Sequence, residues 1–497
     1  MSVMKPQQSS SISRREFFDA ASKYTAGGLT IFAASPGAAI AAATPQAVSP
    51  LLPDISRFVV NLRFDAIPAK ALANGKAAIT DCLGVAVAGG SEESARILGQ
   101  LARAENAKPE ATCYGQRFRS SVIQAALVNG AAAHAHDFDH SFVLGGQPTS
   151  PIIPAVFSLG ETLKASGKQL LEAYVAGFEL VGAMIFAVQN AGGAGWHANG
   201  TIGVFGATAA CAKLFDLSES QTQMALAIAA SMASGITANF GTMTKPLHVG
   251  QAARNGVLAG RLAKSGFTAN IQTLEARNGF FDCYYPAGKV DVRPFAELGR
   301  TYSLERYGVR FKPYPCGGLT HTSIYATILM RNEHRITPDD VDHVDVAVPA
   351  DTAAPLTYRV PRVGLEGKFS MPYLIARALN DGNVTLETFT DEAVRDPKVL
   401  QLLERVEMKV DPTLQSGADG SRPARVTIKL KGGQTHTLVQ QFPKGSPQVP
   451  MTSAEMLAKF RGCVRGVMKD ASVDRALSYI DSLETVASIN PLVGLLK

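Results

Sequence analysis

Apolar residues in the first 285 positions recur mainly at helical spacing. Segments rich in Ala, Gly and other small residues follow one another from about residue 54, and the apolar–polar alternation that is typical of strands is nearly absent. Ser218 and Gln221 have the spacing of a capping box, which marks a helix start. The pattern predicts helices at residues 69–88, 121–136, 152–165, 169–187, 201–215, 218–234 and 250–265.

The pattern changes after a stretch at residues 286–300 that contains glycine, proline and mixed charges. Beyond it, strand-like alternation is interrupted by two helical segments, and helical spacing returns near the C-terminus. We therefore expect a mainly α protein, with a large all-helical domain formed by residues 44–288 and 445–497 and an inserted α+β domain at residues 289–444. The predicted strands are 341–348, 406–410 and 425–430, and the predicted later helices are 369–380, 397–405 and 453–482.

The first 43 residues have the layout of a twin-arginine export signal. Arg14 and Arg15 precede two phenylalanines, and a weakly apolar run rich in Gly and Ala ends in three alanines before Thr44. Glycines and a proline break this run, so it is a poor transmembrane helix. We expect cleavage between Ala43 and Thr44, export to the periplasm, and no stable membrane association of the mature protein.

Composition and charge exclude several classes of protein. With 46% hydrophobic and 18% charged residues, the chain is too apolar to be disordered, and 497 residues are enough for two or three packed units. The formal net charge of +6 comes from scattered Lys and Arg, whereas nucleic-acid binding needs them clustered. The six cysteines show neither a pairing pattern nor a CxxC zinc motif, which suits a protein that folds before export.

The densest polar cluster, at residues 134–141, follows an Ala-rich predicted helix, and its histidines and aspartates are costly to bury without a function. In one interpretation they ligate a metal, although their spacing is one residue longer than the HxHxDH motif of hydrolases and no strand precedes them. In another, Asp137 and Ser141 face one pocket, the carboxylate as a base and the hydroxyl as a substrate ligand. In a third interpretation, the cluster is simply a solvated helix end whose polar side chains bind water and cap the backbone. The cluster consists of His134, His136, Asp137, Asp139, His140 and Ser141.

Three further clusters carry groups that suit an anionic ligand. Lys245 precedes the helix predicted at residues 250–265, so its ammonium could join the amides of that helix terminus. A loop at residues 308–321, rich in Gly and Pro, is either a second anion pocket or a rigid hinge. His197 follows the only Trp in a Gly-rich turn. The other polar residues of these clusters are His248, Arg254, Arg310, Lys312, Tyr314, Cys316 and His321.

Taken in order, these motifs resemble the MmgE/PrpD family over roughly residues 55–490. The resemblance implies an all-helical domain built from both ends of the chain, an α+β lid, a homodimer, and an active site between the domains without a metal or organic cofactor. It also implies an activity like that of 2-methylcitrate dehydratases, cis-aconitate decarboxylases or iminodisuccinate epimerases. The matching motifs are HDFD at 136–139, His197 before Gly200 and Thr201, KPLHVGQAAR at 245–254, FKPYPC at 311–316 with His321, and GKFSMPY at 367–373.

The same resemblance assigns the site residues, with two departures. Ser141 stands where the family commonly has Thr, which keeps the hydroxyl, and Gln147 stands where it has a His before Pro148. Because a Gln can hydrogen-bond a carboxylate but cannot shuttle a proton near neutral pH, this departure indicates either a different substrate or a reaction in which other groups transfer the proton. The expected catalytic residues are Asp137, His197, Lys245 and Lys312, and the expected substrate-binding residues are Ser141, Gln147, His248, Tyr314 and His321.

The sequence therefore predicts a cofactor-independent lyase, either a dehydratase or a decarboxylase, acting on a small di- or tricarboxylic acid by proton transfer at a carbon next to a carboxylate. The lysines would stabilise the developing charge, and Asp137 or His197 would move the proton. The alternatives are an epimerase or isomerase of a carboxylate in the same fold, a metal-dependent hydrolase using His134 to His140, and an exported binding protein. We expect a homodimer without a nucleic-acid partner.

Overall fold

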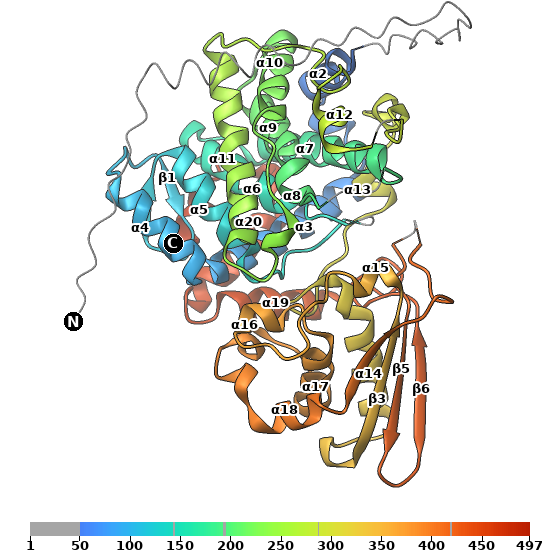
Figure 1. Cartoon of the computed structure of the whole chain (residues 1–497). Coiled ribbons are helices and arrows are strands. Elements are labelled where there is room, and N and C mark those ends of the chain that lie inside the picture. The colour runs from blue at the N-terminus through green and yellow to red at the C-terminus, as the bar shows by residue number, and fades with distance from the viewer. Residues whose placement is uncertain (1–49, 143–144, 192–194, 287, 418–419) are drawn as a thin grey trace, which may run out of the picture. The chain divides into compact units, whose positions relative to one another are not determined.

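Helices pack against helices throughout the first half of the chain, as the small-residue pattern predicts (Figure 1). Over the residues that the structure describes, the protein is mainly α, with two small sheets. The predicted signal peptide lies outside the described residues. The computed structural model describes residues 50–142, 145–191, 195–286, 288–417 and 420–497.

The helices of the first half agree closely with the predicted ones, including the capping box of Ser218 and Gln221. One start is wrong: the helix expected from residue 250 begins at Thr244, which places Lys245 within its first turn. Pro246 is compatible with that position, because the amide that proline lacks would have no partner there. The helices are α2 (Leu51–Asn61), α3 (Ala69–Gly89), α4 (Glu93–Ala104), α5 (Val122–Ala135), α6 (Thr149–Leu163), α7 (Gly167–Val188), α8 (Ala198–Thr201), α9 (Gly203–Leu214), α10 (Glu219–Ala230), α11 (Thr244–Lys264), α12 (Phe280–Tyr284) and α13 (Ser303–Arg306).

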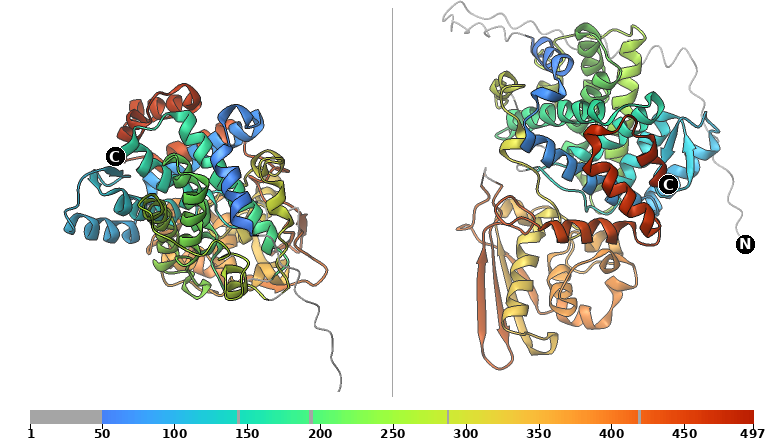
Figure 2. Two further views of the ribbon diagram at one scale, coloured as in Figure 1. Left: turned by 90° about the horizontal axis from the view of Figure 1, so that it is seen from above. Right: turned by 180° about the vertical axis from the view of Figure 1, so that it is seen from behind.

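A four-stranded sheet in the order β4-β3-β5-β6 forms the second half, with helices α14 and α17 packed against it (Figure 2). Strand β3 pairs parallel with β4 and antiparallel with β5. The elements are α14 (His321–Glu333), β3 (Val341–Val348), α15 (Ala350–Ala353), α16 (Gly364–Gly367), α17 (Met371–Asp381), α18 (Pro397–Leu403), β4 (Val406–Val410), β5 (Ala424–Leu430) and β6 (Thr435–Gln440).

Three strands were not predicted, and one segment that was predicted as a single helix forms two separate helices. Strands β1 (Ala111–Cys113) and β2 (Phe118–Ser120) form a hairpin too short for alternation to be visible, and β6 is an edge strand with few apolar residues. The helix predicted at 453–482 is broken at Gly466, whose φ of +78° ends regular helix. The resulting helices are α19 (Ser453–Val464) and α20 (Asp470–Asp481), followed by α21 (Asn490–Leu495).

Buried apolar side chains form two main cores. The first combines residues from 52–309 with residues from 460–496, because α19 and α20 pack on α3. The second takes its residues from 314–428 and lies around the four-stranded sheet. The C-terminal helices therefore complete the first core by packing against a helix from the N-terminal part of the chain.

Helix α7 is long and apolar enough to cross a membrane by length and composition alone. However, 83% of its most apolar window is buried inside the protein, where the helix contributes to the first core. It is the one described helix that passes this test.

Candidate active site

The polar cluster of residues 134–141 lies at the C-terminal end of helix α5, in the interior of the protein. The helix is apolar on all sides and buried almost throughout. It stops at His136, and Asp137 adopts a left-handed backbone conformation with φ of +51°. A non-glycine residue in this conformation persists where its surroundings hold it, and here buried partners surround Asp137.

Two lysines from distant segments share the carboxylate of Asp137. Lys245 Nζ, from the first turn of α11, lies 3.1 Å from Asp137 Oδ1, and Lys312 Nζ lies 2.7 Å from the same oxygen. All three side chains are almost fully buried. The ammonium of Lys245 also lies over the rings of Phe240 and Phe369, at 5.3 and 5.5 Å from their centroids, which adds a cation–π attraction.

These contacts decide which groups are charged. Burial alone would raise the pKa of Asp137, but the two ammonium groups outweigh it and hold that pKa well below the usual range. Burial would lower the pKa of Lys312, but the Asp137 carboxylate raises it instead. The pKa of Lys245 is lowered by burial and by repulsion from Lys312. Asp137 is therefore an anion held by cations rather than a group poised to accept a proton.

Three histidines lie beside this ion cluster and are uncharged near neutral pH. His197 Nδ1 is 3.1 Å from His248 Nδ1, and the His134 ring centroid is 5.5 Å from that of His197. Burial lowers the pKa of each, assisted by the positive charge of Lys245. A neutral imidazole has a free lone pair, so His197 can accept a proton from a ligand.

A cavity of about 310 Å³ lies against these groups. It is lined by residues from α8, α11, the loop after α5 and the segment that leads from α13 to α14. Six of the nine predicted site residues line it: Asp137, Ser141, Gln147, His197, Lys245 and Lys312.

Gln147 is held in one orientation by its neighbour Asn199. Asn199 Nδ2 donates to Gln147 Oε1 at 2.5 Å, and the backbone amide of Gln147 donates to Asn199 Oδ1 at 2.7 Å. Since Asn199 occupies the carbonyl end, Gln147 offers its amide nitrogen to a ligand. Gln147 can thus bind an oxygen of a carboxylate but takes no part in proton transfer.

Two arginines at the cavity were not predicted as site residues. Arg310 pairs with Ser141 through a backbone bridge, and its guanidinium donates to the carbonyl of Gly420. Arg422, between β4 and β5, forms an ion pair with Asp351 at 2.7 Å. Arg310 was visible in the 308–321 motif, whereas no local signal distinguished Arg422, because only folding brings it to the cavity.

The other three predicted site residues do not line this cavity. His248 lies behind His197, to which it is hydrogen-bonded. Tyr314 lines a different cavity. His321 bonds to the carbonyl of Cys316 at 3.3 Å and packs against Tyr314. Direct substrate contact stays a prediction for these residues.

The histidines of residues 134–140 point to different partners. His134 bonds to Asp139 at 2.9 Å, His140 bonds to Asp81 at 3.0 Å, and His136 faces Glu92 at 3.8 Å. His134, Asp137 and Asp139 do have ligand atoms within 4.8 Å of one another. A cation there would compete with the two ammonium groups on Asp137, so this donor set suits a metal poorly.

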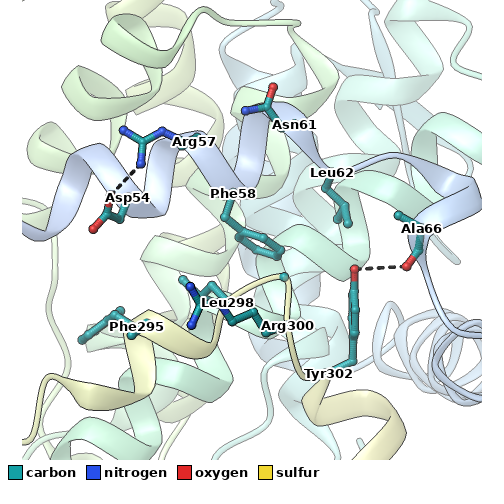
Figure 3. A pocket seen from close by; sticks show the side chains of 12 residues that line it. Asp54, Arg57, Phe58, Asn61, Leu62, Ala66, Phe295, Leu298, Arg300 and Tyr302 are labelled. Atoms are coloured by element: carbon teal, nitrogen blue, oxygen red, sulfur yellow. Dashed lines mark hydrogen bonds and ion pairs between the residues drawn. The ribbon is translucent and has the colours of Figure 1, made fainter.

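Two larger cavities elsewhere lack such chemistry. One of about 540 Å³ lies between α2 and residues 295–302 (Figure 3). Its pair Asp54–Arg57 is solvent-exposed, and Tyr302 donates to the carbonyl of Ala66 at 3.3 Å. Another, of about 590 Å³, contains Tyr314 and Lys459. Neither combines buried lysines with a shared carboxylate.

The fold and site define a mainly α protein with a buried, cationic pocket for a small molecule. The sequence profile of the MmgE/PrpD N-terminal domain matches residues 53–293, and that of the MmgE/PrpD C-terminal domain matches residues 314–485. The chain therefore belongs to the MmgE/PrpD family, as its motifs predict.

Curated relatives align over most of the chain. Cis-aconitate decarboxylase of Mus musculus is 29% identical over 439 residues, which cover 85% of this chain and 88% of the relative. Cis-aconitate decarboxylase of Aspergillus terreus is 26% identical over 484 residues, which cover 92% and 97%. Both similarities extend over the two cores and the site between residues 134 and 422.

Proposed function

We propose that this protein is a cofactor-independent lyase that acts on a small di- or tricarboxylic acid by proton transfer at a carbon next to a carboxylate. The observation that carries the proposal is the charge of the cavity. Lys245, Lys312, Arg310 and Arg422 line it, whereas Asp137 is the one carboxylate among the described lining residues. The two buried ammonium groups of Lys245 and Lys312 share a single carboxylate, that of Asp137, and the positive charge that this leaves in the cavity suits the carboxylates of a small acid.

The buried lysines would bind and stabilise charge. A carboxylate in the cavity can accept hydrogen bonds from Lys245 and Lys312, and these ammonium groups stabilise the enediolate-like anion that forms when the adjacent carbon loses a proton or CO₂. Asp137 keeps both ammonium groups in place. Its carboxylate is already occupied by the two ammonium groups, so we assign the role of base to His197, which lines the cavity and whose imidazole is uncharged.

Both lyase reactions can be balanced with these groups. In a dehydration, His197 takes the proton from carbon, and the leaving hydroxyl takes a proton from Lys245, whose pKa is lowered. In a decarboxylation, the C–C bond breaks, CO₂ leaves, and the carbanion takes its proton from Lys245. Gln147 and Ser141 orient the substrate in either case. Because the relatives are named decarboxylases, we favour lyase chemistry over epimerisation or metal-dependent hydrolysis.

Several further expectations from the sequence belong to this proposal. We propose that residues 289–444 act as a lid, since the cavity is lined both by the loop after α5 and by Phe369 and Arg422. We also propose that the mature protein is a periplasmic homodimer, which rests on the family resemblance and the twin-arginine pattern.

The proposal is tested by NMR of small di- and tricarboxylates incubated with the protein in D₂O. We expect loss of CO₂ or water from one of them. Deuterium incorporation without net change indicates an epimerase, and binding without either indicates a binding protein. Near-stoichiometric zinc or manganese in the purified protein would instead support the hydrolase.

Substitution of the lysines then tests the site. We expect Lys245→Ala and Lys312→Ala each to lower kcat/KM about a hundredfold or more, because each removes charge stabilisation in the transition state. Lys264→Ala is the matched control, since Lys264 is exposed at the other end of α11. Full turnover in both site variants would refute the assignment.

A further inference from the structure

Three consecutive backbone carbonyls at the end of α5 each accept a hydrogen bond from a different lysine. Lys368 Nζ donates to His136 O at 2.7 Å, Lys312 Nζ to Asp137 O at 2.8 Å, and Lys459 Nζ to Phe138 O at 2.7 Å. The three lysines are 4%, 1% and 9% exposed. Buried ammonium groups are costly, so their convergence on one tripeptide needs a physical reason.

The backbone of residues 136–138 supplies that reason. His136 is the C-cap of α5 and the next two residues follow it directly, so their carbonyls lie near the negative end of the helix dipole, where cations are stabilised. Asp137 in addition holds its strained φ of +51°, which these bonds can maintain because they fix the carbonyl before it, its own carbonyl and the one after it.

The lysines come from three separate parts of the chain. Lys312 precedes α14, Lys368 directly follows α16, and Lys459 lies on α19. Lys312 also pairs with the Asp137 carboxylate, and Lys459 pairs with Asp81 at 2.6 Å. For Lys368, no carboxylate lies within ion-pair distance in the described parts of the chain, and Phe389 contacts it at 4.9 Å from the ring centroid. Its main bond is therefore the one to His136 O.

We propose that Lys312, Lys368 and Lys459 form a clamp on the backbone of residues 136–138, and that Lys368 and Lys459 are positioning residues that hold Asp137 in its left-handed conformation. This inference rests on the proposed function, because it takes Asp137 as a group of the active site. Neither Lys368 nor Lys459 lines the site cavity, so both act through Asp137.

The surroundings of Lys368 give the clamp a dependence on pH. Burial lowers the pKa of Lys368 to about 8, against the opposing charges of Glu92 and Asp137. Lys245 adds repulsion, whereas His136, with a pKa lowered to about 3, and Cys316, with a pKa raised to about 12, are uncharged. As pH rises through about 8, the charged donor to His136 O is lost and the bond weakens.

Kinetics of Lys368 variants test the clamp. With the substrate found in the D₂O screen, we expect Lys368→Met to lower kcat about a hundredfold, because misplacement of Asp137 misaligns Lys245 and Lys312. KM should rise by a smaller factor than kcat falls, because the misaligned lysines stabilise the charge of the transition state more strongly than that of the bound substrate. Equal kcat in the variant and the wild type would overturn the inference.

Lys213→Met is the matched control. Lys213 Nζ also donates to two backbone carbonyls, those of Val60 at 2.8 Å and Leu62 at 2.5 Å, at the end of α2 and away from the cavity. It should lower stability and leave kcat and KM within about twofold. A loss of kcat equal to that of Lys368→Met would show that any lost lysine–carbonyl bond has this effect and would overturn a specific clamp.

Lys368→Arg keeps the positive charge, and it tests the clamp if the Lys368→Met variant does not fold. An arginine does not titrate below pH 12, so the alkaline limb of the pH–kcat profile should move up by more than about one pH unit. An unchanged limb assigns the titration to Lys245 and overturns the role of Lys368.

Crystal structures of the variants test the clamp independently of any measurement of turnover. We expect Asp137 to leave the left-handed region in Lys368→Met and in Lys459→Met, while it keeps φ near +51° in Lys213→Met. If no carboxylate is turned over but the conformation changes as expected, the proposed function fails and the clamp stands. If Asp137 keeps its conformation in both clamp variants, the clamp fails whatever the reaction is.

Discussion

Asp137 is the residue on which the charges of the site depend. Its carboxylate is buried, accepts contacts from two ammonium groups and is 4% exposed. Removing one partner of a buried ion cluster leaves the others unpaired, which costs more than the cluster contributes when it is intact. We therefore assign Asp137 to organisation of the lysines, and His197 to proton transfer.

Asp137→Asn tests this assignment through stability. At pH 7 we expect a loss of about 3–5 kcal/mol in the free energy of unfolding, because Lys245 and Lys312 lose their counter-ion. The native pKa of Asp137 lies below its unfolded value of about 3.9, so its contribution is complete above that value and is lost as pH falls through the native pKa. Urea denaturation at pH 7, 5 and 3 should therefore show a difference that shrinks only at the lowest pH.

Asp54→Asn is the control for that measurement. Asp54 pairs with Arg57 at 2.8 Å, but both side chains are more than half exposed. Exposed pairs contribute at most about 1 kcal/mol, so a small effect is expected at every pH. Equal losses in the two variants would contradict the role given to Asp137.

At the scale of elements, the contact between α5 and α11 places Asp137 beside Lys245. The helices meet at Gly130 and Gly250, where a Cβ on Gly250 would lie 2.4 Å from the carbonyl oxygen of Leu127. Neither the carbonyl nor the facing helix can move away without separating the two helices. The small-residue pattern in the sequence is thus a condition for the geometry of the site.

Gly250→Ala tests the effect of this contact. Overpacking is expected to lower the free energy of unfolding by about 1–3 kcal/mol, even though Ala favours helix, and to lower kcat because Lys245 lies five residues away on α11. Guanidinium denaturation and kinetics check both effects. Gly462→Ala on α19, with open space around the added Cβ, should instead stabilise by up to about 1 kcal/mol. Unchanged stability in Gly250→Ala would contradict the close-packing argument.

At the scale of the whole molecule, export and folding are connected. All six cysteines lie within the described residues and are free, and five of them are buried. A chain that needs no disulfide can fold in a reducing cytoplasm, and the twin-arginine route exports proteins that are already folded. The proposed periplasmic location is therefore compatible with this fold.

Replacing Arg14 and Arg15 together by Lys tests the export proposal. We expect the variant to remain in the cytoplasm of a bacterial host that has the twin-arginine system, with residues 1–43 uncleaved. Cell fractionation and the intact mass of the protein measure this, and the wild type should begin at Thr44. Export of the double variant at the wild-type level would refute the proposal.

Local sequence signals located most helices and part of the sheet. The sequence pattern identified α3, α7 and α10 within a few residues, because runs of Ala and other helix-favouring residues without strand-like alternation are a local signal. The edge strand β6 was missed because its partner β5, and not its own sequence, keeps it extended. The start of α11 was missed because Pro246 is ambiguous between a helix break and a first turn.

Motif order by itself determined the family, the position of Asp137 and the set of cleft lysines, since these are properties of residue type and spacing. Only the tertiary structure decided how the groups are charged and which of them share the cavity. Lys245 and Lys312 meet at one carboxylate, Arg422 enters the site, and Tyr314 does not line it. Proton affinity depends on burial and on charges a few ångströms away, and residues far apart in the chain supply both.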